Sequence, residues 1–158
     1  MDASDVTVSA ESPYCGDAVM LMQELSRQLR AMTGDSGNAS FDAGDVCDER
    51  AVFAIARDQD GNGVGCGAIR PISKTTAEVK RMYTREKGRG IGRLLLAFLE
   101  ECAYNMGYHS LCLETRLVNQ GAVAFYEKNG YGRIPNYGKY INRPECVCFE
   151  KRLIPGGD

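Results

Sequence analysis

The sequence predicts an α/β protein in which a mixed β-sheet is covered by helices. Apolar residues recur at helical spacing in two long stretches, and short apolar runs of strand character lie between them. Gly, Asp and Asn clusters separate the two kinds of segment, and the predicted order is β-α-β-β-β-α-β-α-β. No repeat or linker divides the 158 residues, so we predict a single domain over 1–158.

The N-terminal third begins with a predicted edge strand over Asp5–Ala10. Apolar residues at helical spacing then predict a helix over 18–32, and Gly34 is a natural stop for it. Residues 34–50 are rich in Gly, Asp, Asn and Ser, which predicts a loop with one short helical turn near Asp45–Asp48.

The middle of the chain predicts a β-hairpin, a third strand and a helix. Ala51–Arg57 and Val64–Arg70 are strands joined by a segment with both D-G and N-G turn signals. Thr75–Thr84 is the next strand. A helix with one apolar face follows over 91–106 and ends at Gly107.

The C-terminal part predicts two more strands around a short helix. Ser110–Thr115 is a short strand, and Gln120–Lys128 is a helix with Asn119 as its N-cap. Asn129-Gly130 ends that helix, and Glu145–Leu153 is the last strand.

A glycine-rich turn with flanking cations is the clearest functional signal in the chain. Residues 85–96 have the sequence R-E-K-G-R-G-I-G-R-L-L-L, so the turn leads directly into an apolar helix. Gly88, Gly90 and Gly92 remove side chains where a ligand would contact backbone N–H groups. The helix N-terminus adds unpaired N–H groups and the positive end of the helix dipole. The segment is therefore typical of a phosphate or pyrophosphate site.

Two common phosphate-binding motifs do not fit this turn. A P-loop requires Lys followed by Ser or Thr, and that pair is missing here. In a dinucleotide fingerprint counted from Gly88, Arg93 occupies the last glycine position. Residues 63–68 match the string G-x-G-x-x-A, but they lead into a strand-like run, so we interpret that match as chance.

Two segments resemble motifs of the GNAT N-acetyltransferase superfamily. Residues 85–90 have the spacing Q/R-x-x-G-x-G/A, and residues 119–131 resemble the segment N-x-x-A-x-x-x-Y-x-x-x-G-F/Y. The resemblance covers roughly residues 50–153. It implies a twisted, mostly antiparallel mixed sheet of six to seven strands, acetyl-CoA as co-substrate, and a primary amine of a small molecule or peptide as acceptor.

The resemblance also implies which residues hold coenzyme A. The pyrophosphate would lie on the glycine turn, and the pantetheine arm would pair with exposed backbone of the preceding strand. Asn119 would contact the same arm while it caps its helix. The implied site comprises Met82, Tyr83, Thr84, Lys87, Gly88, Arg89, Gly90, Ile91, Gly92, Arg93, Asn119 and Tyr126.

Direct attack of the amine on the thioester needs an acid, a base and an oxyanion site. Tyr126 is the candidate acid, because a phenol keeps its proton at neutral pH and can donate it to sulfur. Glu78 is the candidate base, and strand alternation predicts that Glu78, Lys80 and Met82 share one face. Glu114 and a water chain are the alternatives for the base. Backbone N–H groups near Met82 and Tyr83 are expected to stabilise the oxyanion.

The composition of the chain argues against several classes of partner and predicts where the protein is located. The formal net charge is −2 and the pI is about 5.5, which argues against a nucleic-acid partner. No apolar run is long enough for a membrane span and the N-terminus lacks a cationic start, so we expect a cytoplasmic protein. The seven cysteines contain no C-x-x-C, which favours reduced, mostly buried thiols over a metal site.

The loops over 34–50 and 135–140 are expected to wall the acceptor pocket. A homodimer is possible, and another acyl donor is an alternative. A non-catalytic acyl-CoA sensor of the same fold is the alternative function.

Overall fold

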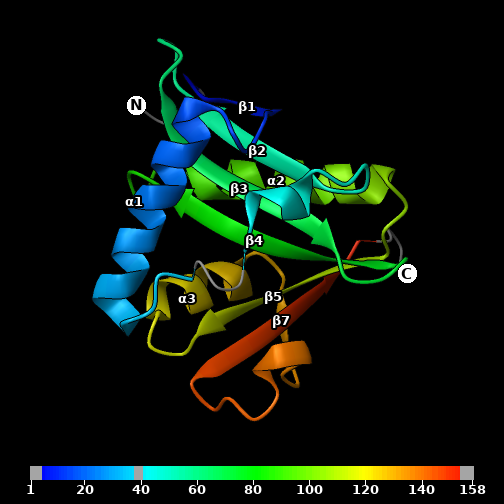
Figure 1. The fold of residues 1–158 in the computed structure, drawn as a ribbon. Coiled ribbons are helices and arrows are strands. Elements are labelled where there is room, and N and C mark those ends of the chain that lie inside the picture. The colour runs from blue at the N-terminus through cyan, green and yellow to red at the C-terminus, as the bar shows by residue number, and fades with distance from the viewer. Residues whose placement is uncertain (1–4, 38–40, 154–158) are drawn as a thin grey trace.

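The computed structural model describes residues 5–37 and 41–153, and these residues form one seven-stranded sheet with helices on both faces (Figure 1). The strands are β1 (Thr7–Ala10), β2 (Val52–Arg57), β3 (Gly63–Pro71), β4 (Thr76–Thr84), β5 (Ser110–Arg116), β6 (Gly132–Ile134) and β7 (Cys146–Arg152). The α-helices are α1 (Gly16–Thr33), α2 (Ile91–Asn105) and α3 (Gln120–Lys128), and two short 3-10 helices are η3 (Ala43–Val46) and η4 (Gly138–Tyr140).

The strand order is β1-β2-β3-β4-β5-β7-β6, and every neighbouring pair is antiparallel except β4 and β5. This arrangement confirms the predicted mixed, mostly antiparallel sheet. All six predicted strands are present within a few residues of their expected bounds. β6 was not predicted, because its three residues are too few to show an alternating pattern.

The central strands β4 and β5 are paired only at their beginnings. Their parallel register joins Thr76 to Ser110, Ala77 to Leu111 and Glu78 to Cys112, and no pairing continues beyond Glu78. Both strands extend further, to Thr84 and Arg116, so they diverge from that point (Figure 1). The divergence leaves backbone groups of β4 without a neighbouring strand, and this is the structural origin of the site described below.

The two faces of the sheet carry separate hydrophobic clusters. On one face α1 packs with Leu21 against Phe53 and Ile55. On the other face α2 and α3 cover the sheet, and the apolar stripe of α2 includes Leu95 and Leu99. This stripe has the helical spacing that the sequence showed, and burying it on the sheet is the main reason α2 is stable there.

The segment between α1 and β2 follows the predicted pattern. α1 ends at Gly34, which has φ 81 and donates its N–H to the carbonyl of Arg30, a helix stop that favours glycine. The predicted short turn is η3, which begins at Ala43, two residues before the predicted start at Asp45. Residues 38–40 of the predicted 34–50 loop lie outside the described residues.

Among the described helices, none combines the length and the apolar character needed to cross a membrane. Cysteine side chains are mostly inside the protein, as predicted. Cys66, Cys112, Cys146 and Cys148 are buried, whereas Cys47 is exposed. Cys146 and Cys148 pack in the same small cluster, as expected for residues two apart on one strand.

Candidate active site

A cleft of about 1170 Å³ opens where β4 and β5 diverge. Its walls come from the last six residues of β4, the glycine turn, the start of α2, the end of β5 and the first turns of α3. We call the part formed by residues 86–93 the phosphate end. We call the part formed by Val79–Thr84, Glu114 and Tyr126 the acyl end. All twelve predicted coenzyme A residues line this one cleft: Met82, Tyr83, Thr84, Lys87, Gly88, Arg89, Gly90, Ile91, Gly92, Arg93, Asn119 and Tyr126.

The backbone shapes the phosphate end. Gly88 and Gly90 have φ values of 76 and 78, in the left-handed region that residues with a Cβ rarely adopt. Gly90 is the N-cap of α2 and provides no side chain, so the first N–H groups of the helix are not satisfied by a cap. These groups and the helix dipole favour a bound anion.

Gly92 has a different reason to be glycine. A Cβ at this position would lie 3.3 Å from Cζ of Phe125, which is closer than side chains usually approach. The absence of a side chain therefore lets α3 lie directly against the start of α2. This contact brings Tyr126, the neighbour of Phe125, to the same cleft as the glycine turn.

The cationic side chains near the glycine turn do not all line the cleft. Arg85 donates from Nε and NH2 to the carboxylate of Glu24 on α1, both at 2.9 Å, and it does not line the cleft. Arg89 forms a longer contact of 3.6 Å with Glu86, and both side chains are half-exposed. Lys87, Arg89 and Arg93 line the cleft. The arginine that begins the glycine motif thus connects the turn to α1.

A β-bulge at Arg81 and Met82 overturns one prediction from strand alternation. Arg81 has φ 58, and the register with β3 shifts between Cys66 and Ala68. Lys80 lies opposite Ala68, which packs with α1, whereas Met82 packs in the cluster of α2. The prediction that Glu78, Lys80 and Met82 share one face was therefore wrong, because the extra residue turns Met82 to the other face.

Tyr126 is buried at the acyl end, with 7% of its surface exposed. Its ring packs edge-on against Phe125 and Tyr131 at centroid distances of 5.1 and 5.7 Å. Among the described residues no hydrogen-bond partner of its hydroxyl is found, although the tyrosine lines the cleft. Burial raises the pKa of the Tyr126 phenol above its usual value, so the group keeps its proton across the physiological range.

Glu78 is fully engaged inside the protein. Only 2% of its surface is exposed, and it is not among the residues that line the cleft. One carboxylate oxygen accepts from Arg70 at 2.9 Å and the other accepts from the Tyr137 hydroxyl at 2.6 Å. Arg70 also contacts Asp45 at 2.8 Å, so the pair joins β3 and β4 to η3 and to the 135–140 loop.

Glu114 occupies a different environment. It lies near the end of β5, lines the cleft and is only partly buried. Lys80 and Tyr140 line the same region, and the Lys80 ammonium donates to the Tyr140 hydroxyl at 2.9 Å. Burial lowers the pKa of Lys80, while the nearby Glu78 carboxylate acts in the opposite direction. Of the two glutamates considered as base, Glu114 is the one that can meet an acceptor in the cleft.

The remaining predicted residues also lie at the cleft. Asn119 caps α3, since its Oδ1 accepts from the Ala122 N–H at 3.2 Å, and it lines the wall as well. Both loops expected to wall an acceptor pocket contribute residues, with Asp35 and Gly37 from one and Lys139 and Tyr140 from the other. Lys80, Arg81 and Arg143 also line the cleft and were not predicted to do so. They lie outside both motifs, and their approach depends on the bulge and on the C-terminal loop.

Comparison with known proteins agrees with this geometry. The model of the acetyltransferase (GNAT) family matches residues 18–131. An IAA acetyltransferase of Azospirillum brasilense is 34% identical over 152 residues, covering 94% of this chain and 99% of that protein. A solved structure from Klebsiella pneumoniae, provisionally named an acyl-CoA N-acyltransferase, has a TM-score of 0.80 and 27% identity over 94% of this chain and 98% of that one.

A further structural relative was solved with acetyl-CoA bound. It is a GNAT family acetyltransferase from Elizabethkingia anophelis, with a TM-score of 0.68 and 18% identity over 94% of this chain and 98% of that one, a likeness that concerns the fold.

The diverging strands, the glycine turn and these matches together define an acyltransferase that uses a coenzyme A thioester. The chain belongs to the GNAT family and is an acetyl-CoA-dependent N-acetyltransferase.

Proposed function

We propose that the whole chain acts as one acetyltransferase domain that moves an acetyl group to the primary amine of a small molecule. The transfer occurs by direct attack while both substrates are bound. The observation that carries the proposal is the cleft itself, which joins a backbone anion site to a buried tyrosine without a described hydrogen-bond partner. The Azospirillum relative, named an IAA acetyltransferase, supports a small-molecule acceptor.

The phosphate end binds and orients the co-substrate. Backbone N–H groups at Gly88–Arg93 contact the pyrophosphate, and the absence of side chains at Gly88 and Gly90 allows that approach. The unpaired edge of β4 over Met82–Thr84 gives the pantetheine arm hydrogen-bond partners. Acetyl-CoA supplies the activated acetyl group.

The acyl end handles protons and developing charge. Glu114 accepts a proton from the incoming ammonium, which frees the lone pair for attack. Backbone N–H groups near Met82 stabilise the oxyanion, and the C–N bond forms as the C–S bond breaks. Tyr126 donates its proton to the leaving sulfur, and the second proton that the nitrogen loses on becoming an amide restores the phenol through solvent. Glu78 holds Arg70 and Tyr137 in place and so positions the acceptor wall.

An acceptor screen with acetyl-CoA tests this proposal. Purified protein is incubated with panels of amines, and released thiol is measured together with the mass of the acetylated product. Initial rates at varied concentrations of both substrates should give intersecting lines, as expected when both bind before reaction. Coenzyme A binding without thiol release for any amine would instead support the acyl-CoA sensor, and parallel lines would contradict direct attack.

A further inference from the structure

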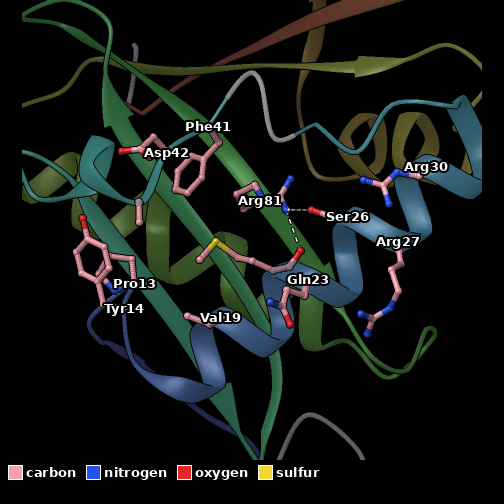
Figure 2. A pocket seen from close by; sticks show the side chains of 12 residues that line it. Pro13, Tyr14, Val19, Gln23, Ser26, Arg27, Arg30, Phe41, Asp42 and Arg81 are labelled. Atoms are coloured by element: carbon pink, nitrogen blue, oxygen red, sulfur yellow. Dashed lines mark hydrogen bonds between the residues drawn. The ribbon is translucent and has the colours of Figure 1, made fainter.

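A second cavity of about 550 Å³ lies beside the catalytic cleft, between α1 and residues 41–43 (Figure 2). We call it the α1 groove, and its walls include Val19, Met22, Arg27 and Arg30 of α1, Phe41, and Arg81 of β4. Among the described lining residues, Arg81 is the one that the groove shares with the cleft. The groove and the acyl end therefore meet at this side chain.

Arg81 is a buried cation whose contacts are all neutral. Only 9% of its surface is exposed. Its NH2 group donates to the Met22 carbonyl at 2.9 Å and to the Ser26 hydroxyl at 2.6 Å (Figure 2). NH1 donates to the Ser36 carbonyl at 3.4 Å. Nε is buried without a hydrogen-bond partner in the described structure. No ion pair joins Arg81 to a carboxylate of the described residues.

Three other arginines of the chain differ from Arg81, because each of them forms an ion pair with a carboxylate. Arg57 contacts Glu11 at 2.7 Å, Arg70 contacts Glu78 at 2.9 Å and Arg85 contacts Glu24 at 2.9 Å. Each of these side chains is more exposed than Arg81, yet each has a carboxylate. A buried charge without a counter-ion is costly, so an anion supplied by a ligand would relieve the cost at Arg81.

The surroundings of Arg81 also favour an anionic ligand with an apolar body. Arg27 and Arg30 are exposed at the rim of the α1 groove, and they add positive charge to it. Asp42 is the acidic residue among its described lining, and its carboxylate already accepts from the Gly44 N–H at 2.9 Å. Val19 and Phe41 offer apolar contact beside these charges.

We propose that the acceptor carries a carboxylate as well as its amine, and that the α1 groove holds this carboxylate against Arg81. The substrate class is then an apolar amino acid or a close analogue. Because Arg81 lines both the α1 groove and the cleft, a carboxylate held there keeps the rest of the acceptor at the acyl end. This inference rests on the proposed function and specifies its substrate.

A matched set of acceptors tests the inference. Apolar α-amino acids are compared with their carboxamides and with the decarboxylated amines, for example phenylalanine, phenylalaninamide and phenethylamine. We expect kcat/KM for the carboxylate form to exceed that of the carboxamide by about tenfold to a hundredfold, the effect of one charge-assisted contact. Equal values, or a preference for the neutral forms, would overturn the inference.

Substitutions of the arginines in the α1 groove test whether these side chains cause the preference for a carboxylate. Arg81→Gln should abolish the preference for the carboxylate, so that the ratio of kcat/KM between phenylalanine and phenylalaninamide falls to about one, whereas a merely structural role would lower both values and keep their ratio. The double variant Arg27→Gln/Arg30→Gln changes exposed residues and should reduce the preference severalfold even if Arg81→Gln does not fold. Arg133→Gln, which removes an exposed cation on the edge strand β6, three strands from β4, is the control and should keep the full preference.

The outcomes separate the two proposals. If no amine of any form releases thiol from acetyl-CoA, the proposed function fails and the inference falls with it. If simple amines are acetylated but carboxylate-bearing amines are not preferred, only the inference fails. A preference that survives in Arg81→Gln and in the double variant also overturns it.

Discussion

The phosphate end and the acyl end of the cleft are built in different ways. Residues 86–93 are contiguous, and the anion-binding role that we propose for them depends on backbone N–H groups and positive φ angles at Gly88 and Gly90. The acyl end combines side chains from three separate elements, β4, β5 and α3. A site made of backbone is encoded locally, whereas a site made of side chains depends on the packing of distant elements.

The largest expected effect is at the phosphate end. Gly90→Val should weaken coenzyme A binding about a hundredfold or more, because the side chain fills the anion site and resists φ 78. Gly61→Val is the matched control, since Gly61 has φ 85 in the turn between β2 and β3. Calorimetry should show the loss of affinity in the first variant alone. Equal affinity in both would contradict the assignment of the turn.

The next effect is at the acyl end. Tyr126→Phe should lower kcat about tenfold to a thousandfold with little change in coenzyme A affinity or stability, because the hydroxyl has no described hydrogen-bond partner. Tyr131→Phe should lower the stability of the protein and leave kcat nearly unchanged. It removes a hydroxyl that donates to Glu100 at 2.8 Å and should cost about 1–3 kcal/mol of unfolding free energy. Steady-state kinetics and urea unfolding measure the two effects, and an unchanged kcat for Tyr126→Phe would exclude it as the acid.

The two glutamates separate a role in proton transfer from a role in architecture. Glu114→Gln should lower kcat about tenfold to a hundredfold and remove the acidic limb of the pH–rate profile. Glu78→Gln should instead lower the unfolding free energy by about 3 kcal/mol, since it breaks a buried pair with Arg70. The Glu78→Gln protein that remains folded should show the same pH–rate profile as the wild type. An altered profile in Glu78→Gln alone would return the base to Glu78.

The smallest effect concerns the ion pair between Glu24 of α1 and Arg85, the residue just before the phosphate end. The Arg85 guanidinium and the Tyr83 hydroxyl hold the pKa of Glu24 below its usual value of 4.5. The pair therefore contributes stability above that value, and the contribution disappears as the pH falls through the lower pKa of the folded state. Glu24→Gln should cost up to about 1 kcal/mol at pH 7 and nothing at strongly acidic pH. Urea unfolding at several pH values would detect this, and a constant difference would argue against it.

Sequence patterns were sufficient to predict those structural features that depend on residues close together in the chain. The stop of α1 at Gly34, the cap of α3 at Asn119 and the turn at Gly88 each follow from residues within one or two helical turns. β6 was missed because three residues carry no periodicity. The face of Met82 was predicted wrongly because a bulge inserts one residue, and nothing in the local sequence marks Arg81 as that residue.

The amino-acid sequence by itself determined the fold class, because helix periodicity and capping are short-range properties of the chain. Its motifs also marked the glycine turn and Tyr126 as candidate site residues. Only the tertiary structure separated Glu78, held by Arg70 and Tyr137, from Glu114 in the cleft. It alone left Arg81 buried without a carboxylate among the described residues. Burial and ion pairing are set by which distant strands and loops meet, and short-range patterns do not contain that information.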